Sequence, residues 1–244
     1  MESIDQLNEM VHKSRHIVFF GGAGVSTESG IPDFRSTEGI FSIEFHRNVG
    51  PEEILSRHCL DTYPELFFSF FEEHLIYPEA QPNAAHRKLA ELEEAGRLSA
   101  VITQNIDGLH QKAGSRNVLE LHGNAYRYFC TDCGQKYDRD YIAGHSQDIV
   151  PRCETCGGII RPDIVLYGER LDGSLLREAE NQILGADMLI VAGTSLLVYP
   201  AATMTDFYSG HRFVILNRSP LETERNPDLF IQGDVGEIMS RMEV

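Results

Sequence analysis

The stretch from His16 to Thr27 reads HIVFFGGAGVST, so a run of apolar residues passes directly into a glycine-rich turn. A buried strand, then such a turn, then a helical pattern is the order of a dinucleotide-binding fingerprint. Glycines there let the backbone approach a pyrophosphate, and the N-terminus of the helix favours its negative charge. This stretch therefore indicates an α/β fold with a nucleotide site after its first strand.

Two features depart from the dehydrogenase form of this fingerprint. The third glycine position holds Thr27, and about twenty residues later the chain reads Ile40-Phe41-Ser42, where an acidic residue is expected. Taken alone, the turn fits nucleotide binding and a tight turn without a ligand equally well. These departures disfavour a hydride-transfer dehydrogenase.

Strand and helix patterns alternate along the rest of the chain. The sequence predicts strands at 16–20, 100–103, 118–121, 164–166, 188–192, 213–216 and 229–231, and helices at 5–14, 51–60, 63–77, 84–95, 174–184, 200–208 and 235–241. Asn83 can cap the helix at 84–95, and Gly96 can end it. Continuous apolar strands between helices are typical of a doubly wound parallel, Rossmann-like sheet. Residues 30–48 are expected to form a long functional loop.

Four cysteines come as two pairs with nineteen residues between them, at Cys130, Cys133, Cys153 and Cys156. This spacing fits one zinc ion held by four thiolates. Such a site has no open position for water, so the zinc is expected to be structural. The short strands and turns expected around the cysteines predict a small zinc-ribbon module inserted into the α/β fold.

The composition narrows the class of protein. The chain has 244 residues and a formal net charge of −16, which disfavours binding to nucleic acid and to anionic membranes. The N-terminus lacks the features of a signal peptide, and no apolar run is long enough to span a bilayer. Cysteines in metal spacing fit a cytoplasmic, reducing compartment. The fifth, Cys59, is expected to be a buried apolar side chain.

Several sequence blocks occur together in a fixed order. They are GAGVS at 22–26, GIPDFR at 30–35, TQNIDGLH at 103–110, LHG at 121–123, both cysteine pairs and GTSLLVYPA at 193–201. In this combination the chain resembles the sirtuins, NAD-dependent protein-lysine deacylases, from about Ile17 to Val235. Its compact length resembles that of bacterial or archaeal members. The resemblance implies an NAD-binding Rossmann-like domain at 1–36, 98–122 and 161–244, a helical module with the cofactor loop at 37–97, and a zinc-binding module at 123–160.

The resemblance also implies which residues bind NAD. Arg35 would lie near the diphosphate, Phe34 beside the nicotinamide ribose, and Gln104 at ribose hydroxyls. The nicotinamide would lie in a pocket of Asn105, Ile106 and Asp107. The remaining implied NAD contacts are Gly22, Ala23, Gly24, Thr27, His122, Gly193, Thr194, Ser195, Asn217, Asp234 and Val235. Many of these follow strands, where ligands of parallel sheets bind.

Catalysis in this family consumes NAD. The amide oxygen of an acyl-lysine attacks C1′ of the nicotinamide ribose, and a base then activates a ribose hydroxyl. The resemblance assigns the base to His122, with Asn105 and Asp107 orienting the nicotinamide; histidine suits the role because its pKa lies near neutral pH. Products would be nicotinamide, an O-acyl-ADP-ribose and free lysine. Among the other histidines, His86 and His110 are expected to be packing or hydrogen-bonding groups.

The implied substrate is an acetylated-lysine protein or peptide. Two segments would pair with its backbone as strands, Val165-Leu166-Tyr167-Gly168-Glu169 and Val198-Tyr199. Tyr167 stands where the family usually has Phe. Sirtuins that prefer acidic acyl groups carry a Tyr and an Arg at positions matched here by Phe68 and Phe71. The sequence therefore predicts a pocket for acetyl and longer apolar acyl groups that disfavours succinyl, unless these phenylalanines simply belong to the core.

Other functions compete with deacetylation. Mono-ADP-ribosyl transfer uses the same NAD cleavage and is the main alternative, although His122 and the peptide-pairing segments favour deacetylation. A zinc-ribbon nucleic-acid binder is disfavoured by the net charge of −16 and by the absence of a basic patch near the cysteines. The chain is expected to be a monomer.

Overall fold

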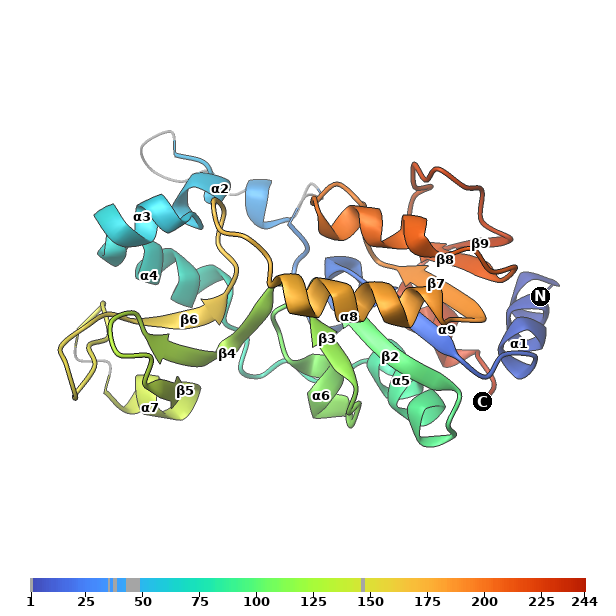
Figure 1. Ribbon diagram of the computed structural model, residues 1–244, viewed down its shortest axis with the longest axis horizontal. Coiled ribbons are helices and arrows are strands. Elements are labelled where there is room, and N and C mark those ends of the chain that lie inside the picture. The colour runs from blue at the N-terminus through green and yellow to red at the C-terminus, as the bar shows by residue number, and fades with distance from the viewer. Residues whose placement is uncertain (1, 35, 37–38, 43–48, 146–147) are drawn as a thin grey trace.

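A six-stranded parallel sheet forms the larger of two lobes in the computed structural model, which describes residues 2–34, 36, 39–42, 49–145 and 148–244 (Figure 1). The strand order is β3-β2-β1-β7-β8-β9. Their bounds are β1 (Ile17–Gly21), β2 (Leu98–Thr103), β3 (Val118–Glu120), β7 (Met188–Ala192), β8 (Phe213–Asn217) and β9 (Leu229–Gln232). The order reverses at β1, which pairs with both β2 and β7. This confirms the doubly wound sheet and places its switch point beside the glycine-rich turn.

Helices cover both faces of this sheet because alternate side chains of each strand point to opposite sides. Ile17 and Phe19 pack with α1 (Glu2–His12), α5 (Ala84–Glu94) and α9 (Val235–Ser240). Val18 and Phe20 pack with α8 (Gly173–Leu184) and the 3-10 helix η4 (Ala201–Phe207). Every residue of β1 and β7 is buried, as their uninterrupted apolar runs predict.

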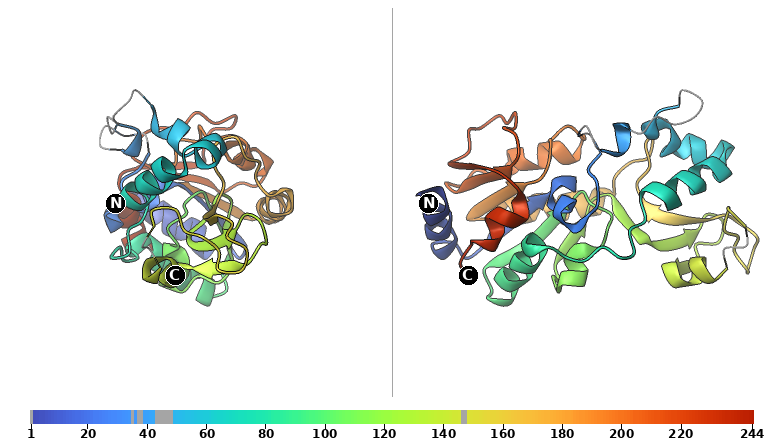
Figure 2. Two further views of the ribbon diagram at one scale, coloured as in Figure 1. Left: turned by 90° about the vertical axis from the view of Figure 1, so that its left-hand side faces the viewer. Right: turned by 180° about the vertical axis from the view of Figure 1, so that it is seen from behind.

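The smaller lobe combines two segments that are distant in sequence (Figures 1 and 2). One is a three-stranded antiparallel sheet, in the order β5-β4-β6, with α7 (Arg139–Gly144) beside it. Its strands are β4 (Gly123–Cys130), β5 (Lys136–Asp138) and β6 (Ile160–Ile164). The other segment contains α2 (Pro51–Ile54), α3 (Arg57–Thr62) and α4 (Pro64–His74). Aromatic residues of α4 share one apolar core with Tyr128 and Ile160 of the small sheet, so the two segments stabilise each other.

Four local predictions were wrong. The helix expected at 51–60 is divided into α2 and α3, with Leu55 and Ser56 between them. The strand expected at 164–166 ends at Ile164 and begins at Ile160, and it pairs with β4 in the small sheet. Two single-turn 3-10 helices, η1 (Ala23–Val25) and η2 (Thr27–Ser29), replace the helix expected after the glycine-rich turn. The helix expected at 200–208 is the 3-10 helix η4. The short elements α6 (Leu109–Ala113) and η3 (Ile40–Ser42) complete the described structure.

The start of α5 shows local sequence signals acting as expected. The Asn83 side chain accepts a hydrogen bond from Ala85 N, and His86 Nδ1 accepts one from Asn83 N, so the two residues form a reciprocal cap. His86 and His110 are fully buried with ring centroids 4.7 Å apart, so both are packing groups as expected. Among the described residues His86 also accepts a hydrogen bond through Nδ1, whereas neither ring nitrogen of His110 has a partner. Gly96 ends the segment with a φ of 71°. Among the described helices, none is long and apolar enough to cross a membrane.

Candidate active site

Loops that follow β1, β2, β3 and β7 meet at the carboxyl edge of the large sheet. The loops after β1 and β2 are joined by a hydrogen bond from Gln104 N to Gly21 O of 3.0 Å. Gly22 N donates to Ala192 O at the end of β7. Leu121 N donates to Thr103 O at 2.9 Å, which adds the loop after β3. Together these bonds bring Gly22, Gln104, His122 and Gly193, which the resemblance assigns to one NAD site, to the same edge of the sheet.

The glycines of the turn are needed for packing between two loops. Gly24 N donates to Gly193 O at 2.7 Å, and Gly193 has a left-handed φ of 58°. A Cβ on Gly22 would lie 2.8 Å from Thr194 Cβ, and one on Gly24 would lie 2.8 Å from Gly193 Cα. Any larger side chain at these positions would force the two loops apart, so the turn is fixed before a ligand arrives.

A buried chain of hydrogen bonds joins the glycine-rich turn to the loop after β2. Asn105 Nδ2 donates to Ser26 Oγ at 3.0 Å, and Ser26 Oγ donates to Asp107 Oδ2 at 2.6 Å. Leu109 N donates to the other carboxylate oxygen of Asp107. Burial raises the pKa of Asp107, although Ser26 and Leu109 N oppose this effect. The orientation of both Asn105 and Asp107 is therefore set by a serine to which the sequence analysis gave no role.

His122 follows β3, and its ring is fixed by the loop after β2. Nδ1 lies 2.9 Å from the backbone oxygen of Gln104, which can only accept, so Nδ1 carries the proton and Nε2 is left as the base. Burial lowers the pKa of His122, and the hydrogen bond to Gln104 partly offsets this. The ring is therefore neutral at neutral pH. Gln104 itself is tied to the loop after β7, because its Nε2 donates to Thr194 Oγ1 at 3.1 Å.

Asn83 holds the glycine-rich turn from the opposite side. Its Nδ2 donates to Val25 O at 2.7 Å and to Ser29 Oγ at 3.0 Å, while its Oδ1 caps α5. The sequence predicted only the cap. The contact with Val25 joins positions far apart in the chain, and no local pattern indicates it.

Three more residues that the resemblance assigns to NAD, Asn217, Asp234 and Val235, lie at or just after the ends of β8 and β9. Gly233 N donates to Asn217 O at 3.1 Å, which brings the loops after β8 and β9 together. Asp234 forms an ion pair with Arg218, and Glu28 accepts a hydrogen bond from Gly236 N at the start of α9. Val235 is buried, and Ser195 is exposed. The glycine-rich turn and these loops thus form one continuous edge.

Three other residues assigned to NAD complete this picture. Phe34 packs edge to face against Phe41, with ring centroids 5.5 Å apart. Thr27 Oγ1 donates to Gly24 O, and Ile106 O accepts from Ala125 N at the start of the smaller lobe. Arg35 lies outside the described residues.

The segment assigned to substrate backbone forms a turn instead of a strand. Glu169 N donates to Leu166 O, and Gly168 has a φ of 88°. On one side the segment is already paired, because Tyr167 N donates to Leu55 O and Arg57 N donates to Tyr167 O. Of the second assigned segment, Tyr199 is exposed and Val198 is half-buried.

The two phenylalanines assigned to the acyl pocket are fully buried in the core of the smaller lobe. Phe67 stacks on Phe71 with ring centroids 5.9 Å apart and contacts Phe68 edge to face at 5.3 Å. Phe34 and Ile106 pack against the same apolar cluster. The core and the expected pocket are therefore contiguous.

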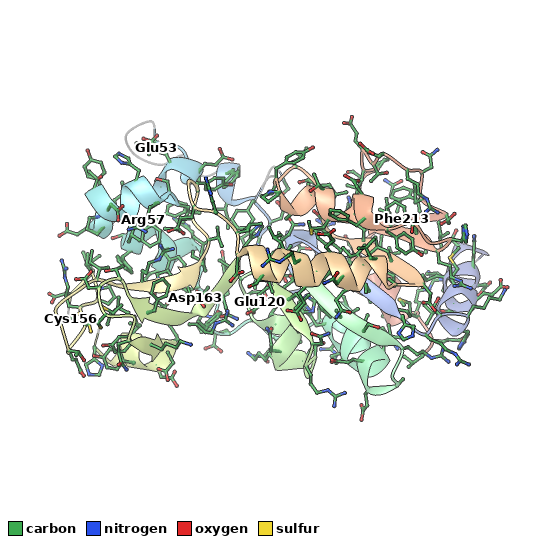
Figure 3. The ribbon with its side chains drawn as sticks, viewed as in Figure 1. Glu53, Arg57, Glu120, Cys156, Asp163 and Phe213 are labelled. Carbon is green, nitrogen blue, oxygen red and sulfur yellow. The ribbon has the colours of Figure 1, made fainter. Side chains whose placement is uncertain are left out.

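The four cysteines converge at the far end of the smaller lobe, where Figure 3 places Cys156 away from the parallel sheet. All four Sγ atoms lie within 4.8 Å of one another. A tetrahedral zinc with bonds of about 2.3 Å places its sulfur ligands about 3.8 Å apart, so the cluster fits the ion. Strand β4 separates the cluster from His122, because it begins at Gly123 and ends at Cys130, and this fits a structural role.

Comparison with known proteins gives consistent results. A model of the Sir2 family matches residues 22–200. The chain is 48% identical over 242 residues to an NAD-dependent protein deacetylase of Clostridium perfringens, covering 99% of this chain and 98% of that protein. It superposes with a TM-score of 0.88, at 40% identity, on a Sir2 structure that holds a deacetylated p53 peptide and 3′-O-acetyl ADP-ribose. A Sir2 complex with a p53 peptide and NAD+ gives 0.85 at 40% identity. Each structural alignment covers 98% of this chain and 96% of the other.

Proposed function

The chain belongs to the Sir2 family, and we propose that it is an NAD-dependent protein deacetylase that removes acetyl groups from lysine side chains. The observation that carries this proposal is the arrangement of His122, Asn105 and Asp107 around one loop junction. His122 presents a neutral Nε2, while Ser26 holds Asn105 and Asp107 in place. A positioned base and a fixed pair of amide-binding groups are what the reaction requires.

Each residue has a distinct part. When bound, NAD supplies the ADP-ribose that accepts the acetyl group, and nicotinamide is released. Asp107 would accept from the carboxamide of the nicotinamide, and Asn105 would orient it. His122 would remove a proton from a ribose hydroxyl through Nε2, and the hydrogen bond from Nδ1 to the carbonyl of Gln104 would stabilise the positive charge that the ring gains. Gly22, Gly24 and Gly193 keep the turn beside the diphosphate free of side chains.

The acyl group is proposed to be acetyl or a longer apolar group. Phe68 and Phe71 belong to an apolar cluster that also contacts Phe34 and Ile106, and neither supplies a cation, so a succinyl carboxylate placed there would lose its hydration without gaining a partner from them. Comparison of acetyl, propionyl and succinyl peptides tests this directly. A gain of succinyl removal in Phe71→Arg would support the assignment of the pocket, and succinyl removal by the wild type would contradict it.

Zinc is proposed to hold the small sheet together and to take no part in the chemistry. One ion per chain, on Cys130, Cys133, Cys153 and Cys156, satisfies all four thiolates. Cysteines that bind zinc as thiolates, without forming disulfides, fit a reducing compartment, which supports a cytoplasmic location.

The deciding experiment is mass spectrometry of an acetyl-lysine peptide incubated with the purified protein, with and without NAD. Loss of the acetyl group only with NAD, together with formation of O-acetyl-ADP-ribose, is the expected result. His122→Ala should abolish both. Release of nicotinamide with the acetyl group intact would favour mono-ADP-ribosyl transfer, and no consumption of NAD would contradict both activities.

A further inference from the structure

Glu169 closes the turn at 166–169 with both its backbone and its side chain. Glu169 N donates to Leu166 O at 2.9 Å, and Leu166 N donates to Glu169 Oε2, also at 2.9 Å. The carboxylate is thus directed back into its own turn. A group in this position fixes backbone geometry and is not free to bind a ligand.

Arg161 of β6 holds this carboxylate in a buried two-point contact. Its two terminal nitrogens lie 2.5 Å from Oε1 and 3.0 Å from Oε2 of Glu169. The remaining donors reach Ile164 O at 2.7 Å and Pro162 O at 3.2 Å. The Arg161 side chain is only 4% exposed. Burial opposes ionisation of Glu169, but Arg161 and Leu166 N outweigh it and lower the pKa of this carboxyl. The pair therefore remains charged.

The helical segment holds the same turn from the other side. Arg57 of α3 lies 3.5 Å from Glu169 Oε1, and its backbone pairs with Tyr167. Figure 3 shows Arg57 above and Asp163 of β6 below, on the same side of the smaller lobe. Within the described part of the chain, Gly168 N and Val165 O have no hydrogen-bond partner. These two groups are available to an extended peptide.

We propose that the Arg161–Glu169 pair is a positioning device that sets the turn at 165–169 for pairing with the backbone of the substrate peptide. Glu169 acts through the turn and does not touch the peptide. Since Arg161 follows Ile160, the partner of Cys130 in the small sheet, the pair also connects the metal-bound end of the lobe to the peptide site. The inference rests on the proposed function, because it takes an acetyl-lysine peptide as the ligand.

The test is direct binding of a fluorescent acetyl-lysine peptide, measured by anisotropy without turnover. Glu169→Gln keeps an acceptor for Leu166 N but loses the charge, and we expect its Kd for the peptide to rise about tenfold or more, as for a lost charge-assisted contact. KM for NAD should change by less than about twofold, since the described contacts of Glu169 are with Arg57, Arg161 and Leu166, none of which is assigned to NAD. Glu72→Gln is the matched control, because Glu72 pairs with Arg139 in the same lobe.

A double-mutant cycle with Arg161→Gln separates positioning from simple loss of folding. If the two residues act as one device, the double variant binds peptide about as weakly as either single variant. Unchanged peptide affinity in Glu169→Gln, or an equal rise in the KM for NAD, would overturn the inference. The inference would also be overturned if a smaller folded fraction of Glu169→Gln, measured by zinc content and thermal unfolding, fully accounted for its weaker peptide binding. Failure of the wild type to remove acetyl groups while it binds the peptide would count against the proposed function alone.

Discussion

Asn83 should stabilise both α5 and the glycine-rich turn, and these two effects can be separated. Asn83→Ala removes the cap, which costs about 1 kcal/mol. It also removes two hydrogen bonds donated to Val25 O and Ser29 Oγ, at about 1 kcal/mol each. We expect the free energy of unfolding to fall by about 3 kcal/mol. If the less ordered turn binds NAD about 1.4 kcal/mol less favourably, the KM for NAD rises about tenfold.

Asn83→Asp tests the turn without removing the cap. Aspartate retains the oxygen that accepts from Ala85 N, but it places a second oxygen against Val25 O, where Nδ2 donates at 2.7 Å. The KM for NAD should rise at least as much as in Asn83→Ala, with α5 still capped. Urea unfolding and steady-state kinetics measure the two effects separately.

Asp172 provides the matched control. It caps α8 by accepting from Ser174 N and Leu175 N, and in the described structure its side chain forms hydrogen bonds only with Ser174 and Leu175. Asp172→Ala should therefore lower the free energy of unfolding by about 1 kcal/mol and leave the KM for NAD unchanged. Equal losses of stability in Asn83→Ala and Asp172→Ala, with the same KM for NAD, would refute the reasoning.

Three further results are expected. His122→Ala should lower kcat by at least about 100-fold, the usual contribution of a general base; in the wild type the lowered pKa of His122 should keep activity high below pH 6.5 and reduce it only as the pH falls through that lower value, which a pH profile of kcat/KM would show. Burial and the nearby Arg87 lower the pKa of His86 to about 4, so between about pH 6.5 and pH 4 the unfolded chain binds a proton at this residue and the folded chain does not. The free energy of unfolding should therefore be unaffected by His86 above about pH 6.5 and should fall toward pH 4, and urea unfolding of His86→Gln should show a weaker fall. A strong chelator should release one zinc per chain and expose the small sheet to protease while the parallel sheet stays protected, and equal digestion of both lobes would contradict a local structural role.

The parallel sheet could be predicted because its strands are buried on both faces, so β1 and β7 appear as uninterrupted apolar runs. Strand β6 could not, since it reads Ile160-Arg161-Pro162-Asp163-Ile164. It lies at the edge of the small sheet, where a proline is tolerated, and its arginine is neutralised by Glu169. Neither fact is visible in the segment itself.

The site shows the same division between local and distant signals. His122, Asn105 and Asp107 lie in sequence blocks that resemble a known family, and the four cysteines have the spacing of metal ligands. The roles of Ser26 and Asn83 depend on contacts with residues more than 50 positions away. The 3-10 turns after β1 have a similar origin, because the chain there is held between Asn83 and Gly193.

Gly123 and Ile164 are opposite each other at the base of the small sheet. The chain thus leaves the large lobe and returns to it within about 5 Å, the separation of one pair of antiparallel residues. Bringing these two points together costs loop-closure entropy only once, when β4 meets β6. Once β4 and β6 are paired, the loop-closure entropy of the connection from β3 to α8 no longer depends on the number of residues between Gly123 and Ile164. The metal-bearing insertion can therefore vary in length at its far end without altering the order in which the parallel strands assemble.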